Sequence, residues 1–278
     1  MKLSRTFRPT LMLALLAVLA PVATARAVTV SPTALFIDSR TPTGTLTLYN
    51  SGTRPEELEI SFAFGYPRSD SAGAVTVELV EAAASGEPSV VPYLRAFPRR
   101  LVLQPGQRQV VRVMVQPPAE LAPGEYWGRV VVRSRGGQAP IEQTQGAVRM
   151  QIDVETAVAT AVLFRKGPVE TGVAVNGATA RAEGGAVTLM LDLERRGGAA
   201  YLGRVAARLI APDGSVAAQT DDAVALYRSL RFRTRLPLPA GAPAGGYRVE
   251  YTVDNERPDL PVSGPLRAPP VTGTAPVR

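Results

Sequence analysis

Short runs of alternating apolar and polar residues, separated by proline and glycine, dominate this sequence. Alternation of period two is typical of β-strands with one buried face, and no segment after residue 27 shows the 3.6-residue period of an amphipathic helix. Turn sequences such as Pro105-Gly106, Pro123-Gly124 and Gly136-Gly137 separate the runs. The pattern predicts an all-β protein built from antiparallel, immunoglobulin-like β-sandwiches. In the first half the expected strands cover 28–37, 45–50, 56–64, 75–80, 93–97, 99–103, 109–115, 126–134 and 148–163.

Residues 1–27 have the order of a secretory signal peptide. Lys2, Arg5 and Arg8 precede an apolar run over 11–22, and small-residue cleavage sites follow within 23–27. The apolar run is shorter than the ~20 residues that a bilayer crossing needs. We therefore expect a cleaved leader, export to the periplasm and no membrane insertion.

The rest of the chain is long enough for two domains. The run over 148–163 ends at Arg165-Lys166-Gly167-Pro168, where we place the boundary. We expect an N-terminal immunoglobulin-like domain over 28–165 and a C-terminal β-sandwich over 166–257. Proline and glycine recur every few residues from Pro258 onward, which predicts a flexible, unpacked tail over 258–278. The strands expected in the second domain cover 186–194, 203–210, 216–220, 229–236 and 247–253.

The composition argues against several classes of function. The chain has no cysteine and no histidine, the residues that supply most zinc ligands, and histidine is also the commonest general acid–base catalyst. The four basic residues of the expected leader make up more than half of the net charge of +7, which removes most support for a nucleic-acid partner. No carboxylate pair stands out. We therefore expect no catalytic residue, metal or cofactor, and a binding role.

The segment 148–155, VRMQIDVE, has an apolar residue at every even position and a polar one at every odd position. In an extended chain Val148, Met150, Ile152 and Val154 therefore share one face. One interpretation is an ordinary strand half-buried against its own core, which the segment alone favours. The other is an edge strand that lends its apolar row to a partner chain, with the charged odd positions limiting unwanted pairing.

The segment 101–113, LVLQPGQRQVVRV, followed by Pro123-Gly124-Glu125-Tyr126-Trp127, resembles the first domain of periplasmic pilus chaperones. The start of the expected mature chain, Val28-Thr29-Val30-Ser31-Pro32, is similar too, and the resemblance covers most of 28–165. It implies two immunoglobulin-like domains set at an angle. The task that it implies is donation of a strand to an incomplete pilus subunit before transfer to an outer-membrane usher. The family's donor residues lie in the last strand of domain 1, which corresponds to Val148, Met150, Ile152 and Val154.

The resemblance also implies charged sites between the domains. Family members carry an interdomain cluster of Glu, Arg and Asp, to which Glu125, Arg165 and Asp254 correspond, and one arginine between two carboxylates would fix the angle between domains. The alternative is three solvated surface charges. The family also holds a subunit's terminal carboxylate with two basic residues. Their positions correspond here to Ala34 and approximately Ala161, which cannot bind an anion, so Arg165 or Lys166 is the candidate carboxylate anchor.

Two further features have structural interpretations. Arg231, Arg233 and Arg235 alternate along one expected strand and could bind an anionic polymer, but a solvated face paired with Asp221 or Asp222 is favoured. Trp127, the single tryptophan, is expected to pack in a core.

Two hypotheses about function follow. The first is a chaperone-like protein that binds a secreted pilus or surface-fibre subunit by strand donation, with an usher as a further partner. The alternative is a structural or adhesive extracellular β-sandwich module without such a client, which the missing anchor residues favour.

Overall fold

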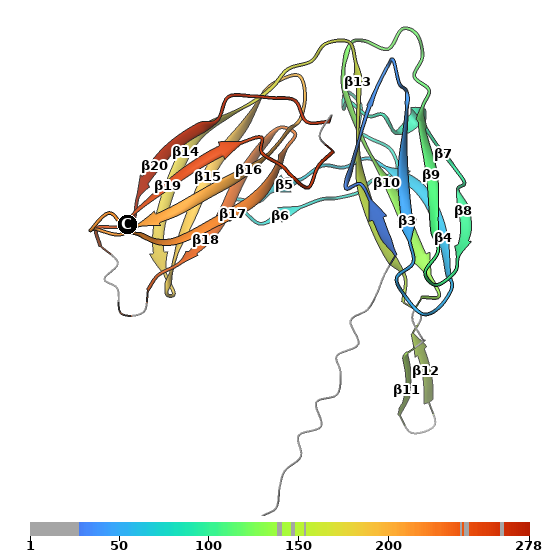
Figure 1. Ribbon diagram of the computed structural model, residues 1–278, viewed down its shortest axis with the longest axis horizontal. Coiled ribbons are helices and arrows are strands. Elements are labelled where there is room, and N and C mark those ends of the chain that lie inside the picture. Colours follow the sequence, from blue (N-terminus) through green and yellow to red (C-terminus); the bar gives the residue numbers. More distant parts are fainter. Residues whose placement is uncertain are drawn as a thin grey trace, which may run out of the picture.

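The computed structural model describes residues 28–137, 141–145, 148–152, 154–239, 241, 245–261 and 264–278, and for 141–145 and 148–152 it describes the backbone alone. The signal peptide expected over 1–27 lies outside these residues. Figure 1 shows two β-sandwiches, one at each end of the molecule, set at an angle to each other. Within the described residues, no helix has the length and apolar character that a membrane span requires.

The first sandwich consists of two sheets whose strands alternate between buried and exposed residues. Neighbouring strands are antiparallel, except for one parallel pair, β2 and β13. Leu46, Ile60, Val111, Val130 and Phe164 are fully buried between the sheets. One sheet has the order β1 (Thr29–Ser31), β3 (Thr43–Tyr49), β9 (Arg108–Val115) and β7 (Leu94–Phe97), which follows the 3-10 helix η1 (Val91–Tyr93). The other has the order β2 (Ala34–Asp38), β13 (Thr156–Lys166), β10 (Gly124–Arg135), β4 (Glu56–Ala63) and β8 (Arg100–Leu103).

The second sandwich has its own apolar core, in which Leu189, Leu191, Val205, Leu209 and Val249 are fully buried. One sheet has the order β14 (Thr171–Glu183), β15 (Ala186–Gly197) and β18 (Ser229–Pro237). The other has the order β17 (Val216–Leu226), β16 (Tyr201–Ile210), β19 (Arg248–Asp254) and β20 (Val271–Pro276). The predicted fold class, two immunoglobulin-like β-sandwiches, is confirmed.

The predicted tail is wrong where it includes β20. This strand pairs with β19 from Arg248↔Pro276 to Val253↔Val271, and Ala275 is buried in the second core. Of the prolines that suggested an unpacked tail, Pro270 lies before the strand and Pro276 is its last residue, where a missing N–H does not interrupt the ladder.

The run predicted as one strand over 148–163 forms two strands. β12 (Val148–Ile152) pairs with β11 (Ile141–Gln145) in a separate hairpin, and β13 begins at Thr156. The pairing of β10 with β13 ends at Ser134↔Thr156, and Gly136 follows with a φ of 90°. Glycine adopts this left-handed conformation without a steric penalty, so the chain leaves the sheet here. The hairpin projects from the end of the first sandwich in Figure 1.

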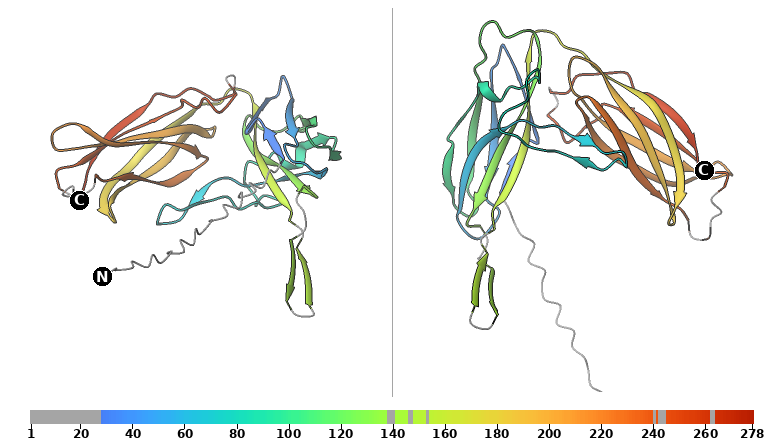
Figure 2. Two further views of the ribbon diagram at one scale, coloured as in Figure 1. Left: turned by 60° about the horizontal axis from the view of Figure 1, so that its bottom comes forward. Right: turned by 180° about the vertical axis from the view of Figure 1, so that it is seen from behind.

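A narrow arm connects the two sandwiches (Figure 2). It contains β5 (Arg68–Ser69) and β6 (Val75–Thr76), and a bridge between Phe64 and Val80 closes its base. At its tip, Asp70 accepts hydrogen bonds from the N–H groups of Ala72 and Ala74, at 2.9 and 2.8 Å, which fixes the turn.

Candidate functional site

The outer edge of β13 is only partly covered. β13 pairs with β10 along its whole length, from Gly124↔Lys166 to Ser134↔Thr156, but with β2 only over Ala161–Arg165. Among the residues that the structure describes, 156–160 have no strand partner on that side. An extended segment of about 16 Å, at 3.3 Å per residue, is therefore open to another chain.

The edge is open because the N-terminal chain changes sheets. β1 pairs with β3 in the opposite sheet, and β2 joins β13 only from Ala34 onward. Pro32 lies between them and has no N–H to donate to a ladder. The chain thus leaves one sheet at the proline and enters the other beyond it.

Small side chains line the open edge. Ala157 and Ala159 are exposed, Val158 is half-buried and Thr160 is buried. The N–H of Ala161 donates to Thr33 O at 3.4 Å, on the β2 side. Because backbone groups alternate in direction along a strand, the N–H and C=O groups of Ala157 and Ala159 also point to the open side.

The predicted donor residues lie next to this edge. Val148, Met150 and Ile152 are in β12, opposite Gln145, Gln143 and Ile141 of β11. The other edge of β12 pairs with no described strand. The side chains of Val148, Met150 and Ile152 lie outside what the structure describes. Val154, between β12 and β13, is half-buried. Their role as donors stays a prediction.

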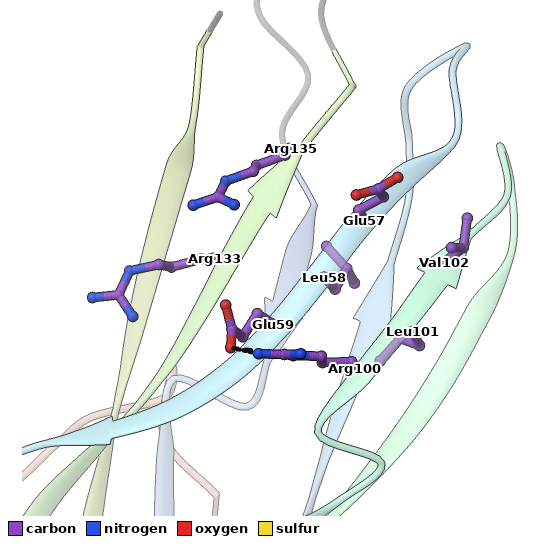
Figure 3. A pocket seen from close by; sticks show the side chains of 8 residues that line it. All are labelled: Glu57, Leu58, Glu59, Arg100, Leu101, Val102, Arg133 and Arg135. Carbon is purple, nitrogen blue, oxygen red and sulfur yellow. Dashed lines mark hydrogen bonds and ion pairs between the residues drawn. The ribbon is translucent and has the colours of Figure 1, made fainter.

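A pocket of about 520 Å³ lies on the same sheet as the open edge (Figure 3). Arg100 pairs with Glu59 at 2.9 Å, and this hydrogen bond lowers the pKa of the Glu59 carboxyl. Arg133 and Arg135 pair with Glu155, which comes directly before β13 and is thereby held against β10. The pocket is lined by Glu57, Leu58, Glu59, Arg100, Leu101, Val102, Arg133 and Arg135.

Glu125 and Arg165 form a buried ion pair at the domain junction. They are opposite one another on β10 and β13, and Arg165 Nε donates to Glu125 Oε2 at 2.8 Å. Glu125 Oε1 accepts from Trp127 Nε1 at 2.9 Å and from the N–H of Ala200 at 2.7 Å. Arg165 Nη1 donates to Gly264 O at 2.7 Å. Backbone groups of the second domain thus complete the arrangement.

Asp254 does not join Glu125 and Arg165, contrary to the prediction. It lies opposite Arg204 across β19 and β16, and Arg204 Nε donates to its Oδ1 at 2.9 Å. Arg204 also pairs with Asp221 and Glu256. The register of its own sheet therefore gives Asp254 a local partner.

An apolar cluster occupies the place where the resemblance implies basic residues. Ala34 and Ala161 lie opposite each other on β2 and β13, and both are buried. Trp127 is buried as predicted, but against the second domain, with its ring centroid 4.9 Å from that of Tyr227. The buried members of the cluster are Ala34, Phe64, Tyr66, Trp127, Ala161, Leu163, Ala200, Leu202, Tyr227 and Leu260.

The candidate carboxylate anchors make contacts within the protein. Arg165 is held by Glu125 and Gly264, as described above. Lys166 Nζ donates to Ala119 O and Leu121 O, both at 2.6 Å. Both side chains are therefore already engaged, and neither is available at the junction to bind a carboxylate of another chain.

Arg129 is a cation at this place that sequence reasoning missed. It lies on β10 opposite Ala161, next to the Ala34–Ala161 pair. Its Nε donates to Gly65 O at 3.0 Å, and its guanidinium carbon lies 5.9 Å from the ring centroid of Tyr227. It is half-buried and makes no ion pair with a described residue. Only the register of β10 and β13 reveals its position.

The described residues contain no group of three or more acidic residues that could hold a metal ion. No protein-family model and no curated protein matches the chain.

Several solved structures are similar to the chain. The Pseudomonas aeruginosa CupB2 chaperone is 11% identical, with 89% of this chain and 100% of that chain covered and a TM-score of 0.40. A chain from the Salmonella enterica SafA pilin–SafB chaperone complex is 13% identical, with 89% and 95% covered and a TM-score of 0.41. A chain from the CsuC–CsuE chaperone–tip adhesion subunit complex of Acinetobacter baumannii is 9% identical, with 88% and 97% covered and a TM-score of 0.43.

Proposed function

We propose that this protein is a periplasmic chaperone-like protein that binds and stabilises a secreted pilus or surface-fibre subunit by β-strand donation. In this proposal the donated segment, β12 and the open edge of β13, pairs with a strand of the subunit. The observation that supports this most is the unpaired stretch 156–160, between the end of β2 pairing and the β11–β12 hairpin. Strand addition uses main-chain hydrogen bonds for affinity and alternate side chains for specificity. The role is one of binding and requires no catalytic group.

The environment of the edge supports this use. An added strand would lie about 4.8 Å from β13 in the hydrogen-bonding direction, to which the N–H and C=O groups of the exposed residues Ala157 and Ala159 point. β12, which precedes the edge, carries the apolar residues Val148, Met150 and Ile152, and these would enter pockets of the incomplete subunit.

Isolation from the cell envelope tests the proposal. We expect an equimolar β-rich subunit to co-purify with the protein. A monomer or homopolymer without such a subunit would support the alternative, a structural or adhesive module.

Charged residues in the apolar row of β12 are expected to release this subunit. The double variant Met150→Asp/Ile152→Asp should reduce the co-purified subunit about tenfold or more, because a carboxylate is excluded from an apolar pocket. Arg149→Gln/Gln151→Asp, at the alternate positions of the same strand, makes the same change in net charge and is the matched control. Undiminished co-purification with the first double variant, at an unchanged melting temperature, would contradict donation by β12.

We propose Arg129 as the residue that binds the terminal carboxylate of the subunit. A guanidinium binds a carboxylate with paired hydrogen bonds, and Arg129 lies beside the two alanines that occupy the expected basic positions.

Arg129→Gln is expected to reduce co-purification about tenfold, whereas Arg129→Lys retains part of it. Arg112→Gln, at an exposed arginine of β9 in the opposite sheet, is the control. Equal losses for Gln and Lys, or for Arg112→Gln, would show that Arg129 has no carboxylate-binding role. Thermal melting separates this effect from loss of the Gly65 contact.

A further inference from the structure

One face of the second sandwich carries four arginines in regular rows. Because β14, β15 and β18 are adjacent and in register, residues at alternate positions form rows across the sheet. Arg181 and Arg235 lie on either side of Thr188, Arg233 is in the next row with Met190, and the third row ends at Arg231. The full rows are Arg181–Thr188–Arg235, Thr179–Met190–Arg233 and Gly177–Asp192–Arg231.

These rows form the floor of a groove of about 780 Å³, and Ser71 and Ala72 at the tip of the arm form its wall. The arm is fastened there. The N–H of Arg231 donates to Ser69 Oγ at 2.7 Å, and its Nη1 donates to Ser71 O at 3.1 Å. A Cβ on Gly73 would lie 2.8 Å from Arg233 Cβ, so glycine allows the arm tip to contact β18 directly.

The groove has an excess of positive charge. Arg231 is neutralised by Asp192, to which its Nε donates at 2.7 Å. Arg181, Arg233 and Arg235 are exposed and form no ion pair with a described residue, and Glu183 is the other acidic residue in the lining. Three guanidinium groups thus face the groove with one carboxylate among them.

The partners predicted for these arginines from the sequence are wrong. Asp221 pairs with Arg204 instead. Asp222 Oδ2 accepts hydrogen bonds from the hydroxyl groups of Thr220 and Thr234, at 2.8 and 2.6 Å. Both acids lie on β17, in the other sheet of the sandwich, so they cannot neutralise the face that Arg233 and Arg235 share.

We propose that this groove binds an extended acidic segment of polypeptide. Alternate residues of an extended peptide are about 6.7 Å apart, the same spacing as Arg233 and Arg235, so successive carboxylates meet successive guanidinium groups. The lining contains no aromatic residue, which argues against single-stranded nucleic acid, whose bases need stacking platforms. Met190 provides an adaptable apolar floor for the aliphatic part of glutamate side chains. The site is separate from the β13 edge and does not depend on strand addition.

Binding of a fluorescein-labelled oligoglutamate, measured by polarisation, tests this. Arg181→Gln/Arg235→Gln is expected to weaken binding about tenfold or more. Arg108→Gln/Arg112→Gln, two exposed arginines of β9 in the first domain, makes the same change in net charge and should alter binding less than about twofold.

If the two double variants weaken oligoglutamate binding equally, the affinity depends on the net charge of the protein alone, and the proposal is overturned. Absence of oligoglutamate binding to the unchanged protein at physiological salt would do the same. Oligogalacturonate serves as competitor. If it displaces most of the peptide at an equal carboxylate concentration, the groove binds the saccharide more tightly and the assignment to polypeptide is wrong.

Discussion

Replacing Ala159 with proline is expected to reduce co-purification of the proposed subunit at least about tenfold while the first sandwich stays folded. The N–H of Ala159 points to the open side of β13, as that of Ala161 does toward Thr33. Proline removes this donor and places its ring where the added strand would lie. The ladder to β10 uses the backbone groups of the neighbouring residues, Val158 and Thr160, and is retained, because edge strands tolerate proline on their open side.

Ala159→Val is the matched control for this variant. It enlarges the side chain and keeps the N–H, so it should retain most of the subunit. Circular dichroism and thermal melting establish that both variants are folded. If the proline variant retains the subunit as well as the valine variant, hydrogen bonding at this edge has no part in binding.

Glu125→Ala is expected to destabilise the protein by about 3–5 kcal/mol. The change leaves Arg165, whose side chain is only 15% exposed, without its carboxylate, and removes the acceptor of the Trp127 Nε1 and Ala200 N–H groups. Removing one member of a buried pair is costly because the other charge remains buried. Urea denaturation, followed by the fluorescence of Trp127 at the domain junction, measures the effect.

Asp254→Ala serves as the comparison and should cost about 1 kcal/mol or less, because its partner Arg204 keeps two more carboxylates, Asp221 and Glu256, at its exposed side. Equal losses for Glu125→Ala and Asp254→Ala would mean that both belong to one interdomain cluster, as the sequence resemblance implied and the geometry contradicts.

Several strands of the first domain were predictable because their signals are local. Alternation and turn residues within a few positions give β3, β4, β9 and β10 close to their observed bounds. The sequence signal for β20 is weak because proline and glycine recur throughout 258–278, and the alternation that accompanies the strand is confined to Val271–Pro276. The break between β12 and β13 depends on where β10 ends, which the alternation in 148–155 does not report.

The site was predictable only where a strand register could be inferred. Glu125 and Arg165 meet because they are opposite one another on adjacent strands of one domain. The place of Asp254 was not predictable, because it depends on how the second domain is oriented. Instead of Asp254, the N–H of Ala200 and the C=O of Gly264 join the second domain to Glu125 and Arg165, and no sequence signal marks these backbone groups. Arg129 and the arginine rows become visible only when neighbouring strands are aligned.

The arm that crosses between the sandwiches has a consequence for the kinetics of recognition. It adds the contacts of Arg231 with Ser69 and Ser71, and Arg228 adds an ion pair with Glu87 at 2.7 Å, to the buried cluster around Trp127. The sandwiches are thus joined by two separate sets of contacts, the hydrogen bonds and ion pair on the arm side and the buried cluster. These contacts restrict hinge bending between the sandwiches in the unbound protein. A rigid protein loses little conformational entropy on association, so binding of the proposed subunit needs no preceding rearrangement of the sandwiches.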